Sequence, residues 1–292
     1  MAAFRIGCVP ITWKNVPQDQ VLSEIAESGY EGCPVWRGKE DTTQDVLDRI
    51  AQYGLEPAPG YLQGYFWQKE KEAETLERAR RQAAFHREIG CTEVYVAAGG
   101  FRAYTTARGL TRDATAGHVL PEDGMTDEEF EQTADMINRV GEITLAEGVR
   151  SCFHNHVATV VETPAEIDRL FSLVDRNLLF MGPDTGHLAF GGADVVQFFR
   201  DYAESIKTVH LKDIDGDVLE EGRAEEWDYD TFKKHGIYTE LGQGMIDFPA
   251  LLEILEGVGF EGWLLVETDI TQLPTALESA VVSREYLRGL GL

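Results

Sequence analysis

The chain has 292 residues, and 43% of them are hydrophobic, which is enough to bury a large core and excludes a disordered protein. Its 51 acidic and 26 basic residues give a net charge of −25. Such an acidic surface repels phosphate backbones and anionic lipids, so we expect neither nucleic acid nor a membrane as a partner. No C-x-x-C pair and no long apolar run occurs. These absences predict a soluble, cytoplasmic protein with reduced cysteines.

A short sequence pattern recurs where a predicted helix ends and a predicted strand begins. A glycine follows an acidic helix end and an apolar stretch begins within a few residues, as in "AESGYEGCPVW", "REIGCTEVYVAA" and "LEGVGFEGWLLVE". Glycine closes a helix in a left-handed cap, and short apolar stretches are typical of parallel strands buried on both faces. The sequence predicts eight such strands, at residues 4–9, 31–36, 56–61, 92–98, 149–155, 178–183, 207–212 and 263–267.

Eight strands that alternate with helices predict an α/β fold, a (β/α)8 TIM barrel that forms one domain over residues 1–292. A doubly wound sheet is the alternative, but no G-x-G-x-x-G motif follows a strand. Among the helices, 127–147 is amphipathic. A second helix, 164–173, opens with a capping box between Thr163 and Glu166.

Two connections, 99–126 and 213–246, are long. Each follows the carboxyl end of a predicted strand, and these ends form the active face of a TIM barrel. Long loops at that face usually build or cover a substrate pocket, so we expect both to lie over the active site.

Four consecutive predicted strands each end in one ionisable side chain: His154, Asp184, His210 and Glu267. Taken singly, a buried histidine is more often a core residue, and an aspartate after a strand is often a helix cap. Two carboxylates in one barrel mouth, however, raise each other's pKa unless a cation compensates them. A divalent metal with mixed nitrogen and oxygen ligands meets this need, so the four residues are predicted to bind one.

The stretch "FHNH" places His154 and His156 on the same face of a strand, because strand side chains alternate. His154 is level with the other strand ends and is the predicted ligand. His156 lies further out, where it is free to move a proton as the catalytic base. The assignment of ligand and base between the two histidines stays open at this point.

Lys212 follows His210 by two residues and faces the same side. We predict an electrostatic or acid role for it, with a salt bridge to Asp213 or Asp215 as the alternative. The aromatic ring at the end of the third strand suits the C–H face of a sugar or cyclitol. Further candidates for substrate contact near the strand ends are Tyr61, Glu162 and His187.

The stretches "FHNHVATVVET", "DTGHLAF", "VHLKD" and "GFEGWLLVE" resemble the xylose isomerase-like barrels of sugar phosphate isomerases and epimerases. The similarity covers nearly the whole chain and is greatest with the inosose dehydratase (2-keto-myo-inositol dehydratase) branch. The resemblance implies a divalent cation, manganese or cobalt first and zinc or magnesium as alternatives. Carried over by position, its ligands are the same four residues. Relatives often form homo-oligomers.

One stretch departs from that branch. After "GYEG" the chain reads "CPVWRG", so Trp36 and Arg37 alter one side of the pocket and become candidate substrate contacts. The resemblance implies a metal-dependent carbon–oxygen lyase that dehydrates a keto-cyclitol or keto-sugar. The alternatives are an isomerase or epimerase, or an eliminase of 3-keto-glycosides. A DNA-repair endonuclease is disfavoured by the charge, and a non-catalytic sugar-binding barrel is the remaining class.

Overall fold

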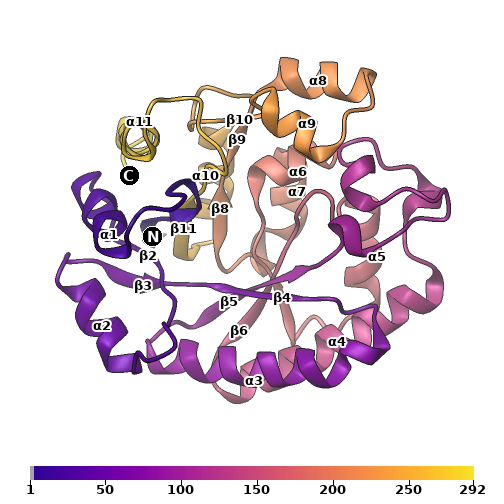
Figure 1. The fold of residues 1–292 in the computed structure, drawn as a ribbon, viewed down its shortest axis with the longest axis horizontal. Coiled ribbons are helices and arrows are strands. Elements are labelled where there is room, and N and C mark those ends of the chain that lie inside the picture. The colour runs from indigo at the N-terminus through magenta and orange to yellow at the C-terminus, as the bar shows by residue number, and fades with distance from the viewer. Residues whose placement is uncertain (1–2) are drawn as a thin grey trace.

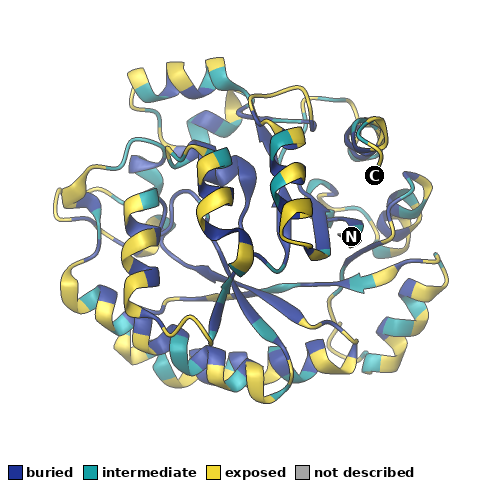
Figure 2. Ribbon diagram, turned by 180° about the vertical axis from the view of Figure 1, so that it is seen from behind, coloured by how far each residue is buried: buried dark blue, intermediate teal, exposed yellow. Residues whose placement is uncertain are grey.

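The computed structural model describes residues 3–292, in which short parallel strands are enclosed by helices (Figure 1). The strands are almost wholly buried, whereas the helices expose their outer faces (Figure 2). The barrel strands are β1 (Ala3–Cys8), β2 (Gly32–Pro34), β3 (Glu56–Ala58), β4 (Tyr61–Gly64), β5 (Glu93–Ala98), β6 (Arg150–His154), β7 (Leu179–Met181), β8 (Val209–Leu211) and β11 (Glu261–Val266).

The strands form two parallel half-sheets, in the orders β3-β2-β1-β11-β8 and β4-β5-β6-β7. Parallel bridges between Met181 and Ile206 and between Asp184 and His210 join the half-sheets on one side. On the other side the chain itself passes from β3 to β4. The predicted TIM barrel is therefore confirmed, and its register places Asp184 and His210 directly opposite each other.

The third predicted strand, 56–61, is not continuous. It is divided into β3 and β4, which pair with different half-sheets. Pro59 has no N–H to donate, and the N–H of Gly60 donates to His86 Nε2 at 3.0 Å instead of to a strand. The barrel wall is consequently interrupted between Ala58 and Tyr61. We call this interruption the seam.

Nine helices cover the barrel in the part of the chain that the structure describes outside the connection 213–246. They are α1 (Gln18–Glu27), α2 (Thr43–Ala51), α3 (Glu72–Glu88), α4 (Asp127–Ala146), α5 (Pro164–Leu173), α6 (Thr185–Phe190), α7 (Val195–Tyr202), α10 (Phe248–Gly257) and α11 (Ala276–Gly289). The two helices predicted in detail, 127–147 and 164–173, are confirmed, as is the Thr163–Glu166 capping box. None of the helices described is long and apolar enough to cross a membrane.

The connection 213–246 has regular structure of its own. It contains β9 (Asp213–Ile214), α8 (Gly216–Ala224), α9 (Tyr229–Lys234) and β10 (Tyr238–Thr239), and β9 pairs with β10 in antiparallel fashion. The connection 99–126 consists of short 3-10 turns at Phe101–Ala103, Arg112–Thr115 and Pro121–Asp123.

A buried ion pair fastens the connection 99–126 to α5. Arg112 is fully buried and donates two hydrogen bonds to Glu166, at 3.0 and 3.1 Å, and a third to the carbonyl of Asp123. Glu162 lies 3.7 Å from the same guanidinium. Because two carboxylates depend on one buried cation, the loss of that cation leaves their charges uncompensated.

We therefore expect Arg112→Leu to lower the free energy of unfolding by about 3 kcal/mol, measured by urea denaturation. Arg102→Leu is the matched control, because Arg102 is largely exposed in its ion pairs with Asp113 and Asp230. It should have a much smaller effect. Equal destabilisation by the two variants would contradict this role for Arg112.

Candidate active site

Four strand-end residues meet in the barrel mouth. The ligand atoms of His154, Asp184 and His210 lie within 4.8 Å of one another. Glu267, which follows β11, lies in direct contact with His210 Nδ1. All four side chains are buried. The parallel register explains the convergence, because each residue stands at the carboxyl end of its strand.

Asn155 holds Asp184 in place. Its side chain accepts the Asp184 N–H at 3.0 Å and donates to the Asp184 carbonyl at 3.2 Å, which ties the ends of β6 and β7 together. Asp184 also caps α6, since its Oδ1 accepts the N–H of His187 at 2.8 Å. Asp184 is therefore a helix cap, as the alternative interpretation predicted, but only one of its two carboxylate oxygens serves as the cap. The other oxygen, Oδ2, faces the cluster.

Lys212 lies between the carboxylates. Its ammonium is 3.1 Å from Asp184 Oδ2 and 2.6 Å from Asp269 Oδ2, and it donates to His187 Nε2 at 2.9 Å. The alternative pairing with Asp213 or Asp215 is wrong. Asp213 instead accepts backbone N–H groups such as that of Gly242, and Asp215 caps α8.

Burial and charge act against each other on these groups. Burial alone would lower the pKa of Lys212, but Asp184 and Asp269 outweigh it and raise that pKa well above its ordinary value. Burial raises the pKa of Asp184 to about 6, although Lys212 opposes the shift. Burial alone would also raise the pKa of Glu267, but Lys212 and His210 hold it below its usual range.

The cluster suits a divalent cation. Three carboxylates, those of Asp184, Glu267 and Asp269, face one ammonium, which leaves two uncompensated negative charges when the histidines are neutral. Several buried polar atoms of the cluster have no hydrogen-bond partner among residues 3–292, including His154 Nδ1, Asp184 Oδ2 and His210 Nε2. Of these, Asp184 Oδ2 has the ion-pair contact with Lys212. Imidazole nitrogen and carboxylate oxygen are ligands for manganese, cobalt and zinc alike.

His156 and His187 lie against each other beside this cluster, with ring centroids 3.7 Å apart. Nδ1 of His156 donates to the carbonyl of Val157 at 2.6 Å, which leaves Nε2 as the free nitrogen. Burial, and then Lys212, lowers the pKa of His156 to about 4, so the ring is neutral at physiological pH. Ligand atoms of His156, His187 and Asp269 also lie within 4.8 Å of one another.

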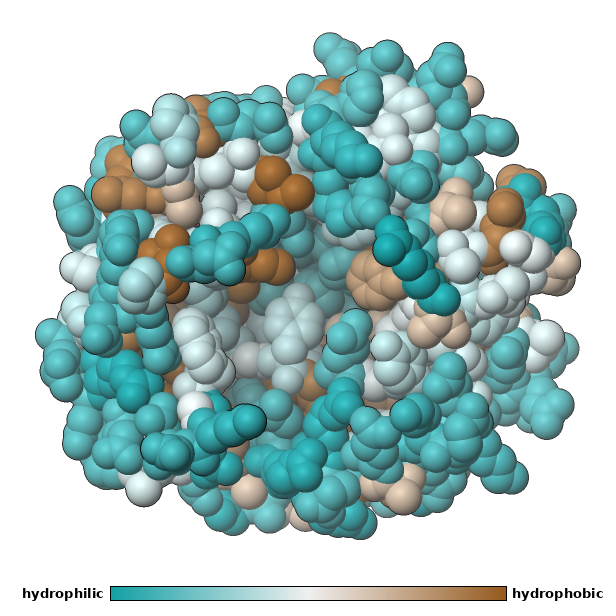
Figure 3. Space-filling model, viewed as in Figure 1, coloured by the Kyte–Doolittle hydropathy of each residue, from teal (hydrophilic) through white to brown (hydrophobic). Residues whose placement is uncertain are grey.

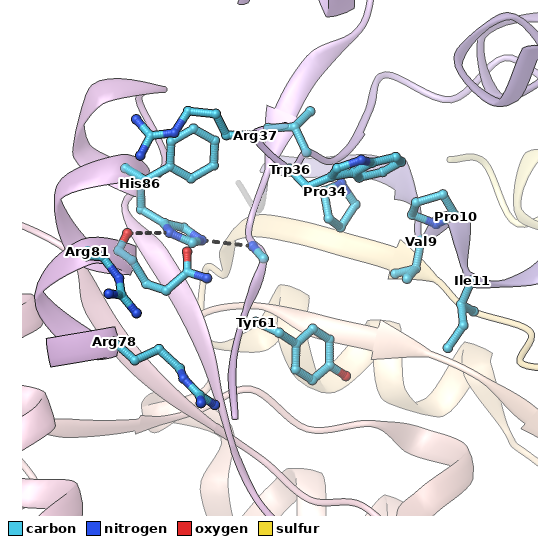
Figure 4. A pocket seen from close by; sticks show the side chains of 14 residues that line it. Val9, Pro10, Ile11, Pro34, Trp36, Arg37, Tyr61, Arg78, Arg81 and His86 are labelled. Carbon is cyan, nitrogen blue, oxygen red and sulfur yellow. Dashed lines mark hydrogen bonds between the residues drawn. The ribbon is translucent and has the colours of Figure 1, made fainter. Parts of the chain in front are cut away.

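The structure separates the remaining candidates. The Tyr61 hydroxyl lies 2.6 Å from His154 Nε2, directly beside the cluster. Trp36 and Arg37 lie away from the histidines and line a pocket at the seam, of which Tyr61 is also a wall (Figure 4). Glu162 is engaged by backbone groups and not by the cluster. Its carboxylate accepts the N–H groups of Gly117 and Ala158, and burial raises its pKa to about 7 despite Arg112.

Two further residues, Asp269 and Asn155, shape the site and were not predicted from the sequence. Asp269 follows Glu267 by two positions, and the same spacing brought Lys212 to notice, so that signal was present. Asn155 lies between the two histidines of "FHNH" and faces the neighbouring strand end, where only the three-dimensional contact with Asp184 gives it a role.

Comparisons with known proteins agree with this geometry. Residues 22–289 match the model of the xylose isomerase-like TIM barrel family. The chain belongs to this family. An inosose dehydratase from Geobacillus kaustophilus is 35% identical over 275 residues, which cover 91% of this chain and 87% of the relative. A rhizopine catabolism protein from Rhizobium meliloti is 33% identical, over 92% of this chain and 82% of the relative.

Among solved structures, a 3-keto-D-glucoside 4-epimerase from E. coli superposes with a TM-score of 0.72 at 17% sequence identity, covering 98% of this chain and 99% of that one. At this identity the likeness concerns the fold. Active sites of TIM-barrel enzymes lie at the carboxyl ends of the strands, which is where the histidines and carboxylates of this chain converge.

We expect Asp184→Asn and Glu267→Gln each to reduce the bound divalent cation, measured by elemental analysis after dialysis against manganese, because each removes a buried negative charge. Asp194→Asn is the matched control, since Asp194 caps α7 as Asp184 caps α6 but stands outside the barrel mouth. Wild-type metal content in both site variants, with circular dichroism showing intact barrels, would show that this ligand set is wrong.

Proposed function

We propose that the chain is a divalent-metal-dependent dehydratase that eliminates water from a keto-cyclitol or keto-sugar, such as 2-keto-myo-inositol. The observation that carries the proposal is the pairing of a cation-binding cluster with a neutral histidine beside it. Support comes also from the inosose dehydratases that resemble this chain over most of its length. The chain is an enzyme, and these relatives make it a carbon–oxygen lyase.

The residues that would hold the cation are His154, Asp184, His210 and Glu267. When bound, the cation would polarise the ketone of the substrate and make the neighbouring C–H acidic. All other steps fall to side chains of the chain itself.

His156 is placed to take the α-proton. Its Nε2 is the free nitrogen, and its neutral ring can accept a proton at physiological pH. Loss of the proton and of the hydroxyl on the next carbon forms a carbon–carbon double bond. The imidazolium formed on His156 can return the proton to the departing hydroxyl, which leaves as water. The product is an unsaturated ketone.

Lys212 serves as a positioned positive charge. Contacts with Asp184, Asp269 and His187 hold its ammonium at the edge of the cluster. From there it can stabilise negative charge that develops on the substrate oxygen. Asp269 positions the ammonium, because it makes the shortest of these contacts from the solvent side.

The two long connections are proposed to cover the bound substrate. They are fastened to each other by Arg223, which donates to the carbonyl of Gly117 at 2.8 Å, and by the ion pair of Arg102 with Asp230. Phe101 brings the connection 99–126 within 5.4 Å of the His156 ring, centroid to centroid.

Hydrogen exchange in both connections should slow together on addition of substrate, and unchanged exchange would contradict a covering role.

The test is turnover of manganese-loaded enzyme with 2-keto-myo-inositol in D2O, followed by NMR. The wild type should form the dehydrated product. His156→Gln should lose at least about 100-fold in turnover and keep the metal, because only the base is removed. His154→Ala should lose both the turnover and the bound metal. Tyr202→Phe is the control, because the Tyr202 hydroxyl donates to Asp168 and not to any residue of the cluster.

Two outcomes would redirect the assignment. Deuterium exchange with an isomeric product and no elimination would make the chain an isomerase or epimerase, which shares the proton abstraction. The absence of exchange and of product with every keto-polyol and 3-keto-glycoside offered would overturn the proposal.

A further inference from the structure

The seam between β3 and β4 opens into a pocket of about 780 Å³. We call it the seam pocket. It lies between the segment after β1, the segment after β2 and the helix α3, and it is distinct from the cluster of ligands. Figure 4 shows arginines on one side of it and the apolar residues Val9, Pro10 and Ile11 on the other, with Trp36 above and Tyr61 below. Figure 3, which has the orientation of Figure 1, shows a hollow in the centre of that face that is less polar than its rim.

Two of the three arginines in this pocket are free to bind a ligand. Arg78 is already engaged, since it donates to Glu74 and to the carbonyl of Gln63. Arg37 and Arg81 make no ion pair and no side-chain hydrogen bond with any residue in the range 3–292. The chain carries 51 acidic residues for 26 basic ones. Two unpaired arginines that face one pocket on so acidic a protein are complementary to an anion.

Beside the polar side chains of Gln82 and His86, much of the remaining lining is apolar. Val9, Ile11 and Phe85 contribute aliphatic and aromatic surface, and Trp36 is 46% exposed. An inorganic ion would leave this surface unused. A group that is apolar along its length and anionic at its end would cover the apolar side and reach the guanidinium groups.

Tyr61 connects the seam pocket to the candidate active site. Its ring lines the pocket, and its hydroxyl contacts His154 Nε2 at 2.6 Å. A sugar ring held at the cluster therefore has Tyr61 at its side, and a substituent on that ring can continue past Tyr61 into the pocket.

We propose that the seam pocket is a subsite for an apolar substituent with an anionic end, so that the substrate is a keto-glycoside with an acidic aglycone. This inference rests on the proposed function and narrows its substrate class. Arg37 and Arg81 bind the anion, and Trp36 packs against the aglycone.

The test uses unreactive probes without a ketone. Phenyl β-D-glucopyranoside, its 4-carboxyphenyl counterpart and its 4-phosphorylated counterpart are titrated into the full-length protein by calorimetry. At least one of the anionic probes should bind about tenfold more tightly than the neutral probe, as expected for a charge-assisted hydrogen bond. The variant with both Arg37→Gln and Arg81→Gln should lose that preference, and added salt should weaken only the anionic probes.

Arg80→Gln is the matched control. It removes the same charge from α3, but Arg80 does not line the pocket and is exposed beside Glu77. It should keep the preference for the anion. Trp36→Ala should weaken all three probes alike, because it removes contact surface and no charge.

Equal affinity for the neutral and anionic probes, no binding of any probe, or a preference that survives in the double variant would each overturn the subsite. These results are independent of the reaction, because the probes have no ketone. Dehydration of 2-keto-myo-inositol without any anion preference would leave the proposed function standing and remove only the subsite. An anion preference without turnover of any keto compound would support the subsite and overturn the proposed function.

Discussion

The structure of the barrel mouth depends on the compensation of buried negative charge. Asp184, Glu267 and Asp269 converge where little water reaches them, and the Lys212 ammonium contacts all three. Burying a carboxylate without a cation costs several kcal/mol, so a cluster with two excess negative charges is poorly stable by itself. A divalent cation held there would remove the excess negative charge, and the proposed function assigns to it the polarisation of the substrate ketone.

The barrel supplies this arrangement through its register. Parallel strands bring their carboxyl ends to one level, and the bridge between Asp184 and His210 closes the gap between β7 and β8 at the level of the ligands. Asn155 adds a clamp across β6 and β7. The same fold leaves the wall open at the seam, since Pro59 has no N–H to donate and the N–H of Gly60 donates to His86 instead of to a strand. A closed ligand cluster and an open side pocket thus lie on either side of Tyr61.

The convergence of the four strand-end residues could be predicted from the sequence because it follows from local rules. A predicted strand that is apolar along its length and ends in His154 or Glu267 indicates that this end lies at the active face. The alternation of side chains along the strand then predicts the direction of each side chain. Residues whose roles depend on distant contacts could not be placed in this way. Glu162 resembles a pocket residue in the sequence, but the long-range contact with Gly117 makes it an anchor for a loop. The seam was not predicted because the apolar stretch 56–61, despite its two prolines, is typical of one continuous strand.

The most direct test of this account is the position of the metal. Crystals of the wild-type protein grown with manganese should show one anomalous peak per chain, within coordination distance of His154, Asp184, His210 and Glu267. The Lys212 ammonium should be turned toward Asp269. No peak at saturating manganese, or a peak only among His156, His187 and Asp269, would contradict the account.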